Sequence, residues 1–300
     1  MLHSLFLFEE RKIMKEKFNE ITPNIKKNFE LVQKCDEILT DLSDRGFILT
    51  LRQLFYQLLS KGLIKNSHSE YTKLSRLIDE SRRAGLIDWE MIEDRTRNLE
   101  KKSHWDSPAE ILEQAVRQYS INTRLTQQIY IEVFCEKQAL SGILAPICKK
   151  LDVPFMAIRG NASTTVMYET AKRLEDKNAV ILYFGDCDAT GLNIPKNIER
   201  RLNEFGVYPL IKRIALNLEQ VQRLNLPPAP LKEKDPNAKK YKEETGLSLT
   251  WELDALPPET LQSMIQIEID ALTDFSEFKK MKELENEHKK QLQKFIMEVA

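Results

Sequence analysis

The 300-residue sequence has few cysteines, almost no net charge and no long apolar run. Its four cysteines show no paired spacing, so a reducing cytoplasm is the natural setting. The formal net charge of −1 excludes a protein that coats nucleic acid through overall basicity, so any DNA binding must come from local patches. No run approaches the ~20 apolar residues that span a bilayer. The apolar opening, residues 1–8, lacks the basic start and the cleavage site of a signal peptide. We therefore expect a cytoplasmic protein without a membrane segment.

What is present is enough apolar sequence, 42%, for a sizeable core, and a length that suggests about two domains. Residues 129–135 and 179–184 are short apolar runs, rich in β-branched and aromatic residues and bounded by polar residues or glycine, which predicts buried strands. Residues 154–159 and 210–216 are further predicted strands. Because helical patterns alternate with these runs, the sequence predicts an α/β domain with a largely parallel sheet.

Acidic residues follow two of the predicted strands. Glu136 comes directly after the first run, and Asp186 and Asp188 follow the second in an Asp-x-Asp-x-x-Gly pattern. Ligands of parallel sheets bind beyond the carboxyl ends of the strands, and carboxylates gathered there repel one another unless a cation neutralises them. With no histidine or paired cysteine nearby, the pattern favours Mg²⁺, for which Mn²⁺ can substitute. A single such acid is more often a solvated loop residue, but the combination favours a metal site. Asp254 is a further candidate acid.

A glycine turn follows the strand predicted at residues 154–159. Gly160 precedes a helix that is expected to reach about residue 174. The N-terminus of such a helix can hold a phosphate through backbone N–H groups, and Arg159 can add a charge-assisted hydrogen bond. These two residues are therefore candidate DNA contacts.

The N-terminal half contains a helix–turn–helix pattern. Thr50 and Gln53 make a capping box that opens a helix ending near Gly62, and the apolar stripe of this helix predicts one buried face. Tyr56 is off that stripe and shares a partly exposed face with Arg52. A second helix, about 70–84, directs three basic residues outward, Lys73, Arg76 and Arg83.

Residues 86–89 and 92–95 then suggest a short ribbon. Helix, turn, helix and ribbon is the order of a winged helix, whose second helix enters the DNA major groove. A small helical domain with salt-bridged surfaces fits the pattern equally well, because acidic residues alternate with the basic ones.

The residues described above resemble a known family. The stretches Val133-Phe134-Cys135-Glu136-Lys137 and Phe184-Gly185-Asp186-Cys187-Asp188-Ala189-Thr190-Gly191 look like the Toprim domain of topoisomerases, primases and related nucleases. They look most like the A subunit of topoisomerase VI and the meiotic double-strand-break transesterase, where proline usually stands in place of Ala189. Residues 50–56 are similar to the motif of that family that ends in the nucleophilic tyrosine. The resemblance covers roughly residues 45–225 and is greatest to the minimal homologues called Mini-A.

The resemblance implies Mg²⁺-dependent cleavage of double-stranded DNA. Tyr56 would attack a backbone phosphate and form a 5′-phosphotyrosyl link, with Arg52 stabilising the charge of the transition state. Asp186 and Asp188 would hold the metal, and Glu136 would ligate it or shuttle a proton. It also implies a homodimer, in which the tyrosine of one subunit faces the metal site of the other, and a separate ATPase subunit that this sequence does not encode.

Two alternatives stay open. One is a hydrolytic Toprim nuclease that uses metal-bound water, with Tyr56 only packing. The other is a non-catalytic winged-helix DNA-binding protein.

The expected organisation has five parts. They are an N-terminal helical extension (1–43), a winged-helix domain (44–106), a linker helix (107–127), a Toprim domain (128–256) and a C-terminal helical segment (257–300). Within the fourth part, residues 227–245 are expected to be an exposed loop. The last helix is expected to run from Pro258 almost to Ala300.

Overall fold

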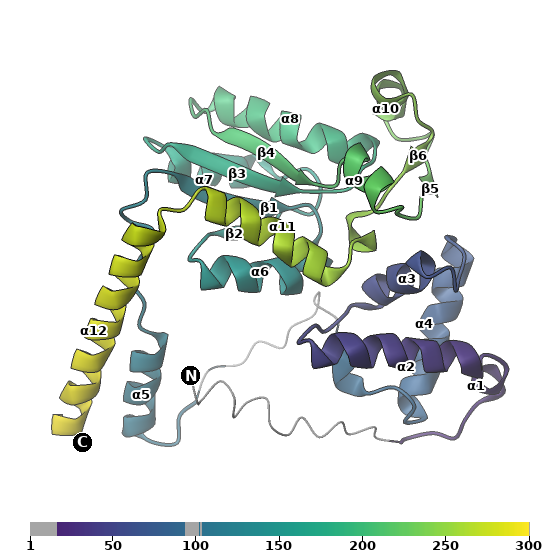
Figure 1. Ribbon diagram of the computed structural model, residues 1–300, viewed down its shortest axis with the longest axis horizontal. Coiled ribbons are helices and arrows are strands. Elements are labelled where there is room, and N and C mark those ends of the chain that lie inside the picture. The colour runs from purple at the N-terminus through teal and green to yellow at the C-terminus, as the bar shows by residue number, and fades with distance from the viewer. Residues whose placement is uncertain (1–16, 94–101, 103, 300) are drawn as a thin grey trace. The chain divides into compact units, whose positions relative to one another are not determined.

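The structure is a computed structural model that describes residues 17–93, 102 and 104–299 (Figure 1). The chain divides into two compact units, which are described separately. The first unit comprises residues 1–95, 224–229 and 254–257, and the second comprises residues 96–223, 230–253 and 258–300. The apolar opening of the chain and the end of the expected ribbon, Asp94 and Arg95, lie outside the described residues.

Helices make up most of the described part of the first unit. They are α1 (Pro23–Lys27), α2 (Phe29–Asp44), α3 (Leu51–Ser60) and α4 (His68–Arg83). The predicted capping box of α3 is confirmed, since the Thr50 N–H donates to Gln53 Oε1 at 2.7 Å and the Gln53 N–H donates to Thr50 Oγ1 at 3.3 Å. The side chains of Thr22 and Ser67 cap α1 and α4 by accepting the N–H groups of Ile25 and Glu70, so short polar residues set where these helices begin.

The ribbon expected after α4 is wrong for the part that the structure describes. Residues Trp89–Met91 form a 3₁₀ turn, and Ile92 pairs with Leu49 in a single parallel bridge. The reason is local. The side chain of Asp88 accepts the N–H of Glu90 at 2.8 Å, which coils the chain where an extended strand was expected. The helix–turn–helix of α3 and α4 is therefore present without a hairpin in residues 86–93.

The second unit is built on a four-stranded parallel sheet with the order β2-β1-β3-β4. Its strands are β1 (Tyr130–Cys135), β2 (Phe155–Ala157), β3 (Ala179–Phe184) and β4 (Leu210–Ala215). All four were predicted, and β1, β2 and β3 are compact apolar runs between polar or glycine boundaries, whereas β4 carries Lys212 and Arg213. Glu132 is the charged exception inside β1, and it is buried as an ion pair with Arg173 at 2.9 Å.

Helices cover both faces of this sheet (Figure 1). The helices α7 (Thr164–Leu174) and α8 (Ala189–Glu204) cover one face, where Met167 and Ile198 pack with Phe134 and Ile181 of the strands. On the other face lie α6 (Ser141–Lys150) and α11 (Pro258–Ala271), which contact each other. The arrangement is an α/β sandwich, in which β1 and β3 are the most buried strands, and β3 is an unbroken apolar run.

Most of the remaining elements are short. They are α5 (Pro108–Gln118), 3₁₀ turns at Gln138–Leu140 and Leu253–Ala255, α9 (Leu218–Arg223), β5 (Ala229–Pro230), α10 (Ala238–Thr245), β6 (Leu249–Thr250) and α12 (Phe275–Val299). The helix α5 packs along α12, and the Tyr119 hydroxyl lies 2.8 Å from His288 Nδ1. No helix within the described ranges is apolar over the length that a bilayer requires.

Two predictions for the C-terminal third are wrong. The lysine-rich stretch, expected to be an exposed loop, forms α10, because Ala238 and Tyr241 lie on one side of it and are buried. The single helix expected from Pro258 is interrupted before residue 275. There, Asp274 Oδ1 accepts the N–H groups of Ser276 and Glu277 and caps a new helix.

Candidate metal site at the carboxyl edge of the sheet

The chain changes direction across the sheet between β1 and β3. From β1 it leaves through α6 to β2 on one side, and from β3 it continues through α8 to β4 on the other. In open parallel sheets this reversal opens a crevice beyond the carboxyl ends of the two strands, where ligands bind. Glu136 follows β1 and Asp186 follows β3, so the topology places both candidate acids at this edge of the sheet.

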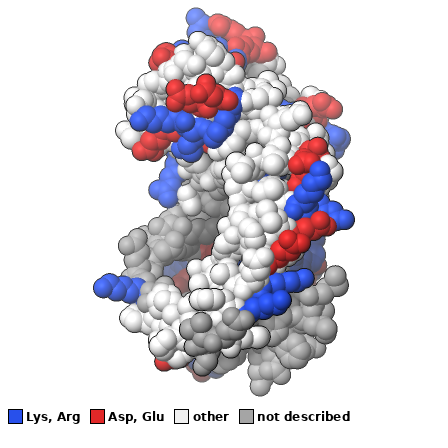
Figure 2. Space-filling model, turned by 90° about the vertical axis from the view of Figure 1, so that its left-hand side faces the viewer, with Lys and Arg blue, Asp and Glu red and all other residues white. Residues whose placement is uncertain are grey.

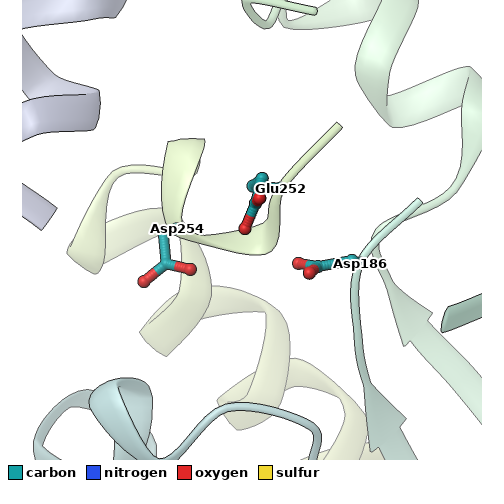
Figure 3. Close-up of side chains that lie close together, drawn as sticks. All are labelled: Asp186, Glu252 and Asp254. Atoms are coloured by element: carbon teal, nitrogen blue, oxygen red, sulfur yellow. The ribbon is translucent and has the colours of Figure 1, made fainter. Parts of the chain in front are cut away.

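A cluster of acidic side chains is found at this edge. Asp186, Glu252 and Asp254 each offer a carboxylate oxygen, and these oxygens lie within 4.8 Å of one another (Figure 3). We call these three residues the acidic cluster. Asp186 and Asp254 are buried, and Glu252 is half-buried. Such a group of carboxylates could bind a metal ion.

Glu252 reaches the cluster through a backbone pairing. Trp251 and Cys187 form an antiparallel bridge in which each N–H donates to the carbonyl of the other, at 2.9 and 3.0 Å. The N–H of Leu253 then donates to Asp186 Oδ1 at 2.7 Å. These bonds hold residues 251–253 against the loop after β3. The chain passes into the first unit directly afterwards, at Asp254.

A lysine lies among the carboxylates of the second unit. Lys137 Nζ is 2.8 Å from Asp186 Oδ1 and also forms an ion pair with Glu252. The lysine side chain is only 14% exposed, so a positive charge is held between two acids away from bulk water. The position of Lys137 indicates that a cation suits the site. The donors are carboxylate oxygens, which hard divalent ions prefer, and the site already stabilises a positive charge.

Glu136 lies next to the cluster and is held by different partners. Its Oε2 accepts the N–H of Asp186 at 3.1 Å and the hydroxyl of Tyr183 at 3.3 Å. Burial raises the pKa of Glu136, and the nearby charge of Asp188 raises it further, while the Asp186 N–H and Lys137 oppose the shift. This carboxyl group therefore holds a proton more readily than an exposed glutamate does.

Asp188 is the N-cap of α8. Its Oδ1 accepts the N–H of Gly191 at 2.6 Å. The glycine of the Asp-x-Asp-x-x-Gly pattern is required here, since a Cβ on Gly191 would lie 2.3 Å from the carbonyl oxygen of Asp186. One oxygen of Asp188 thus has a structural partner, and a carboxylate has further lone pairs available for a ligand.

Arg213 holds the loop that carries both aspartates. From β4, its guanidinium donates to the carbonyls of Gly185 at 3.0 Å, Gly191 at 2.8 Å and Leu216 at 2.9 Å, and also to the carbonyl of Asp186. A planar guanidinium can satisfy several carbonyls at fixed angles, as a lysine cannot. The backbone conformation between residues 185 and 191 therefore depends on this side chain.

Tyr56 differs from its prediction. It was expected on a partly exposed face of its helix, but it is only 5% exposed. Its ring packs edge-on against Phe55, and the guanidinium of Arg52 lies 5.9 Å from the ring centroid. The helix α3 contacts both α2 and α4, so more than one stripe of it is buried. Arg52 is half-exposed as expected, and its Nε lies 3.9 Å from Asp254 Oδ2.

The three basic residues predicted for DNA binding are exposed, and each lies within 3.3 Å of an acidic residue three or four positions away on α4. The pairs are Lys73–Glu70, Arg76–Glu80 and Arg83–Asp79. More widely, basic and acidic side chains lie beside one another on the face shown in Figure 2. Exposed pairs of this kind are weak, so DNA phosphates can compete for the basic groups.

Arg159 and Gly160 form the turn before α7. Both have positive φ, 52° and 87°, which is strained for arginine and ordinary for glycine. The Arg159 guanidinium donates to Gln138 Oε1 at 3.3 Å, so its side chain turns toward the segment after β1. Ser163 then caps α7.

Comparison with known proteins adds no relative. No protein-family model matches the sequence, and no curated protein matches it.

Glu252 was not predicted from the sequence as a site residue. It follows a two-residue strand, β6, which is too short to show a periodic pattern, and the acid two positions on, Asp254, was the only one of this segment named as a candidate.

Proposed function

We propose that the protein cleaves DNA in a reaction that depends on a divalent cation, Mg²⁺ by preference and Mn²⁺ as a substitute. The observation that carries this proposal is the acidic cluster, whose Asp186 and Glu252 lie at the carboxyl edge of the parallel sheet. Oxygen-only donors beside a topological reversal suit a hard ion that binds phosphate. The sequence motifs around Glu136, Asp186 and Tyr56 give the substrate class, since they are similar to those of DNA-cleaving Toprim proteins.

Each residue of the site has a role in this proposal. Asp186 and Glu252 would hold the cation, with Asp188 as an additional ligand, and the bound cation would supply charge stabilisation for the phosphate and the leaving oxygen. Glu136 would exchange a proton with the 3′-oxygen, which its raised pKa favours. Arg213 would keep the loop of Asp186 and Asp188 in place.

The proposed nucleophile is the phenol oxygen of Tyr56, which would form a 5′-phosphotyrosyl link. A phenol has a pKa of about 10 and needs a base or nearby cations to react at neutral pH. Arg52 lies over the ring of Tyr56 and is the candidate for stabilising the negative charge of the transition state. Tyr56 would act on the metal site of a second copy of the chain in a homodimer, as in the proteins that the motifs resemble, and a separate ATPase subunit would be the further partner.

A second candidate function is hydrolytic DNA cleavage with water as the nucleophile. The burial of Tyr56 favours it, because a side chain that is 5% exposed must become accessible before it can attack DNA.

Trapping a covalent intermediate separates the two routes. Supercoiled plasmid would be incubated with the protein and Mg²⁺ or Mn²⁺, and the protein would then be denatured. The DNA products would be compared before and after protease treatment. Transesterification predicts protein attached to 5′ ends in the wild type and none with Tyr56→Phe, which should still bind DNA. Free 5′-phosphates and near-wild-type cutting by Tyr56→Phe would instead establish hydrolysis. Cleavage that persists in Asp186→Ala would contradict both routes.

A further inference from the structure

Lys137 takes up the space where a cation would bridge the acids of the second unit. Its ammonium lies 2.8 Å from Asp186 Oδ1 and forms a second ion pair with Glu252. Both pairs are shielded, since the exposed fractions of the three side chains are 14%, 8% and 22%. An ion pair in such surroundings is much stronger than one on the surface, because solvent screens it little.

The position of Lys137 follows from the local backbone. It is the second residue after β1 and is extended, with φ −108° and ψ 123°. Successive side chains of extended backbone point to opposite sides. Accordingly Glu136 contacts Tyr183 and the Asp186 N–H, while Lys137 contacts the carboxylates of Asp186 and Glu252. Glu136 and Lys137 therefore place one acidic and one positively charged side chain at the same edge of the sheet.

A divalent cation and this ammonium compete for the same oxygens. A cation bound between Asp186 and Glu252 would need the oxygens that Lys137 now contacts, and like charges a few ångströms apart repel strongly in a shielded site. We propose that Lys137 is an internal counter-cation, which neutralises Asp186 and Glu252 in the metal-free protein and leaves this position when a divalent cation binds. The inference rests on the proposed metal site. It adds that Lys137 stabilises the site while no cation is bound and lowers the affinity of the site for a divalent cation.

The test measures cation binding and stability, not cleavage. Full-length wild type and Lys137→Met would be stripped with a chelator, titrated with MgCl₂ and MnCl₂ by calorimetry, and melted with and without each salt. Without the ammonium, the carboxylates repel each other, so the metal-free variant should melt at a lower temperature than wild type. Its Kd for the divalent cation should be at least about tenfold lower, and the cation should raise its melting temperature more than that of wild type.

Controls make each outcome decisive. Lys150→Met removes an exposed lysine at the end of α6 in the same unit and should behave as wild type. Glu252→Gln should lose binding, which shows that the heat arises from the acidic cluster. If Lys137→Met does not fold even with the cation, Lys137→Gln, which keeps a hydrogen-bond donor without the charge, provides the comparison.

If Lys137→Met binds the divalent cation as tightly as wild type or more weakly, the cation does not displace Lys137 and this inference is wrong. The metal site itself would still stand. No binding by wild type or variant would overturn both this inference and the metal-dependent function. Tighter binding by the variant, in a protein that never cleaves DNA, would support the counter-cation and refute the proposed function alone.

Discussion

Asp188 combines two roles that a single alanine substitution would confuse. It caps α8 through a 2.6 Å hydrogen bond from the Gly191 N–H, and it is a proposed metal ligand. Asp188→Ala removes both. Loss of a cap costs about 1 kcal/mol, and loss of a negative charge at a helix N-terminus costs about 0.3–1 kcal/mol more. Asp188→Asn keeps the capping oxygen and the shape of the side chain and removes only the charge.

We therefore expect the two variants to separate in stability but not in activity. Asp188→Ala should lower the free energy of unfolding of its unit by about 1–2 kcal/mol, whereas Asp188→Asn should lose less than about half of that, as measured by urea titration. Both should lose at least about tenfold in metal-dependent plasmid cleavage, because the carboxylate is gone from each. Ser107→Ala, which removes the cap of α5, is the matched control and should lose stability without losing cleavage. Wild-type cleavage by Asp188→Asn would show that Asp188 is only a cap.

Three further predictions concern other parts of the molecule. Alanine substitutions at Lys73, Arg76 and Arg83 of α4 should weaken DNA binding. They should also make the affinity depend less on salt, because roughly one fewer counterion is released for each phosphate contact that is lost. An unchanged salt slope would exclude α4 as the DNA-binding element. Arg213→Met should lower the free energy of unfolding by about 2–4 kcal/mol, because several carbonyls lose their donor, while the surface variant Arg200→Met should change it by less than about 0.5 kcal/mol. Mixed dimers of Tyr56→Phe and Asp186→Ala subunits should nick one DNA strand if the tyrosine and the metal come from different chains, and should be inactive if both come from one chain.

The sheet was predictable from the sequence because its information is local. Three of the four strands are short, mostly apolar runs with polar or glycine boundaries, and β1 and β3 are buried on both faces, as such runs require. The capping box at Thr50 and Gln53 is also local, and it was found for that reason. Glu136 and Asp186 could be placed at one edge because parallel strands bring their carboxyl ends together.

The features that were missed depend on interactions between distant segments. Glu252 joins the site through the bridge of Trp251 to Cys187 and the bond from Leu253 to Asp186, which no sequence periodicity predicts. The burial of Tyr56 follows from packing around α3 that a single apolar stripe does not reveal. The helix α10 was hidden by its lysines, since only Ala238 and Tyr241 mark its buried side. In each case tertiary context decided the outcome over local composition.

The arrangement of Lys137 has a consequence for the order in which the protein can be made. Lys137 and Glu252 are separated by 115 positions, and the bond from Leu253 to Asp186 spans 67. During synthesis the sheet strands emerge well before Glu252, so a nascent chain can form β1 to β4 while Lys137 and Asp186 still lack their last partner. Closing such a long loop is slow compared with helix formation. The site is therefore expected to assemble after the sheet that carries it.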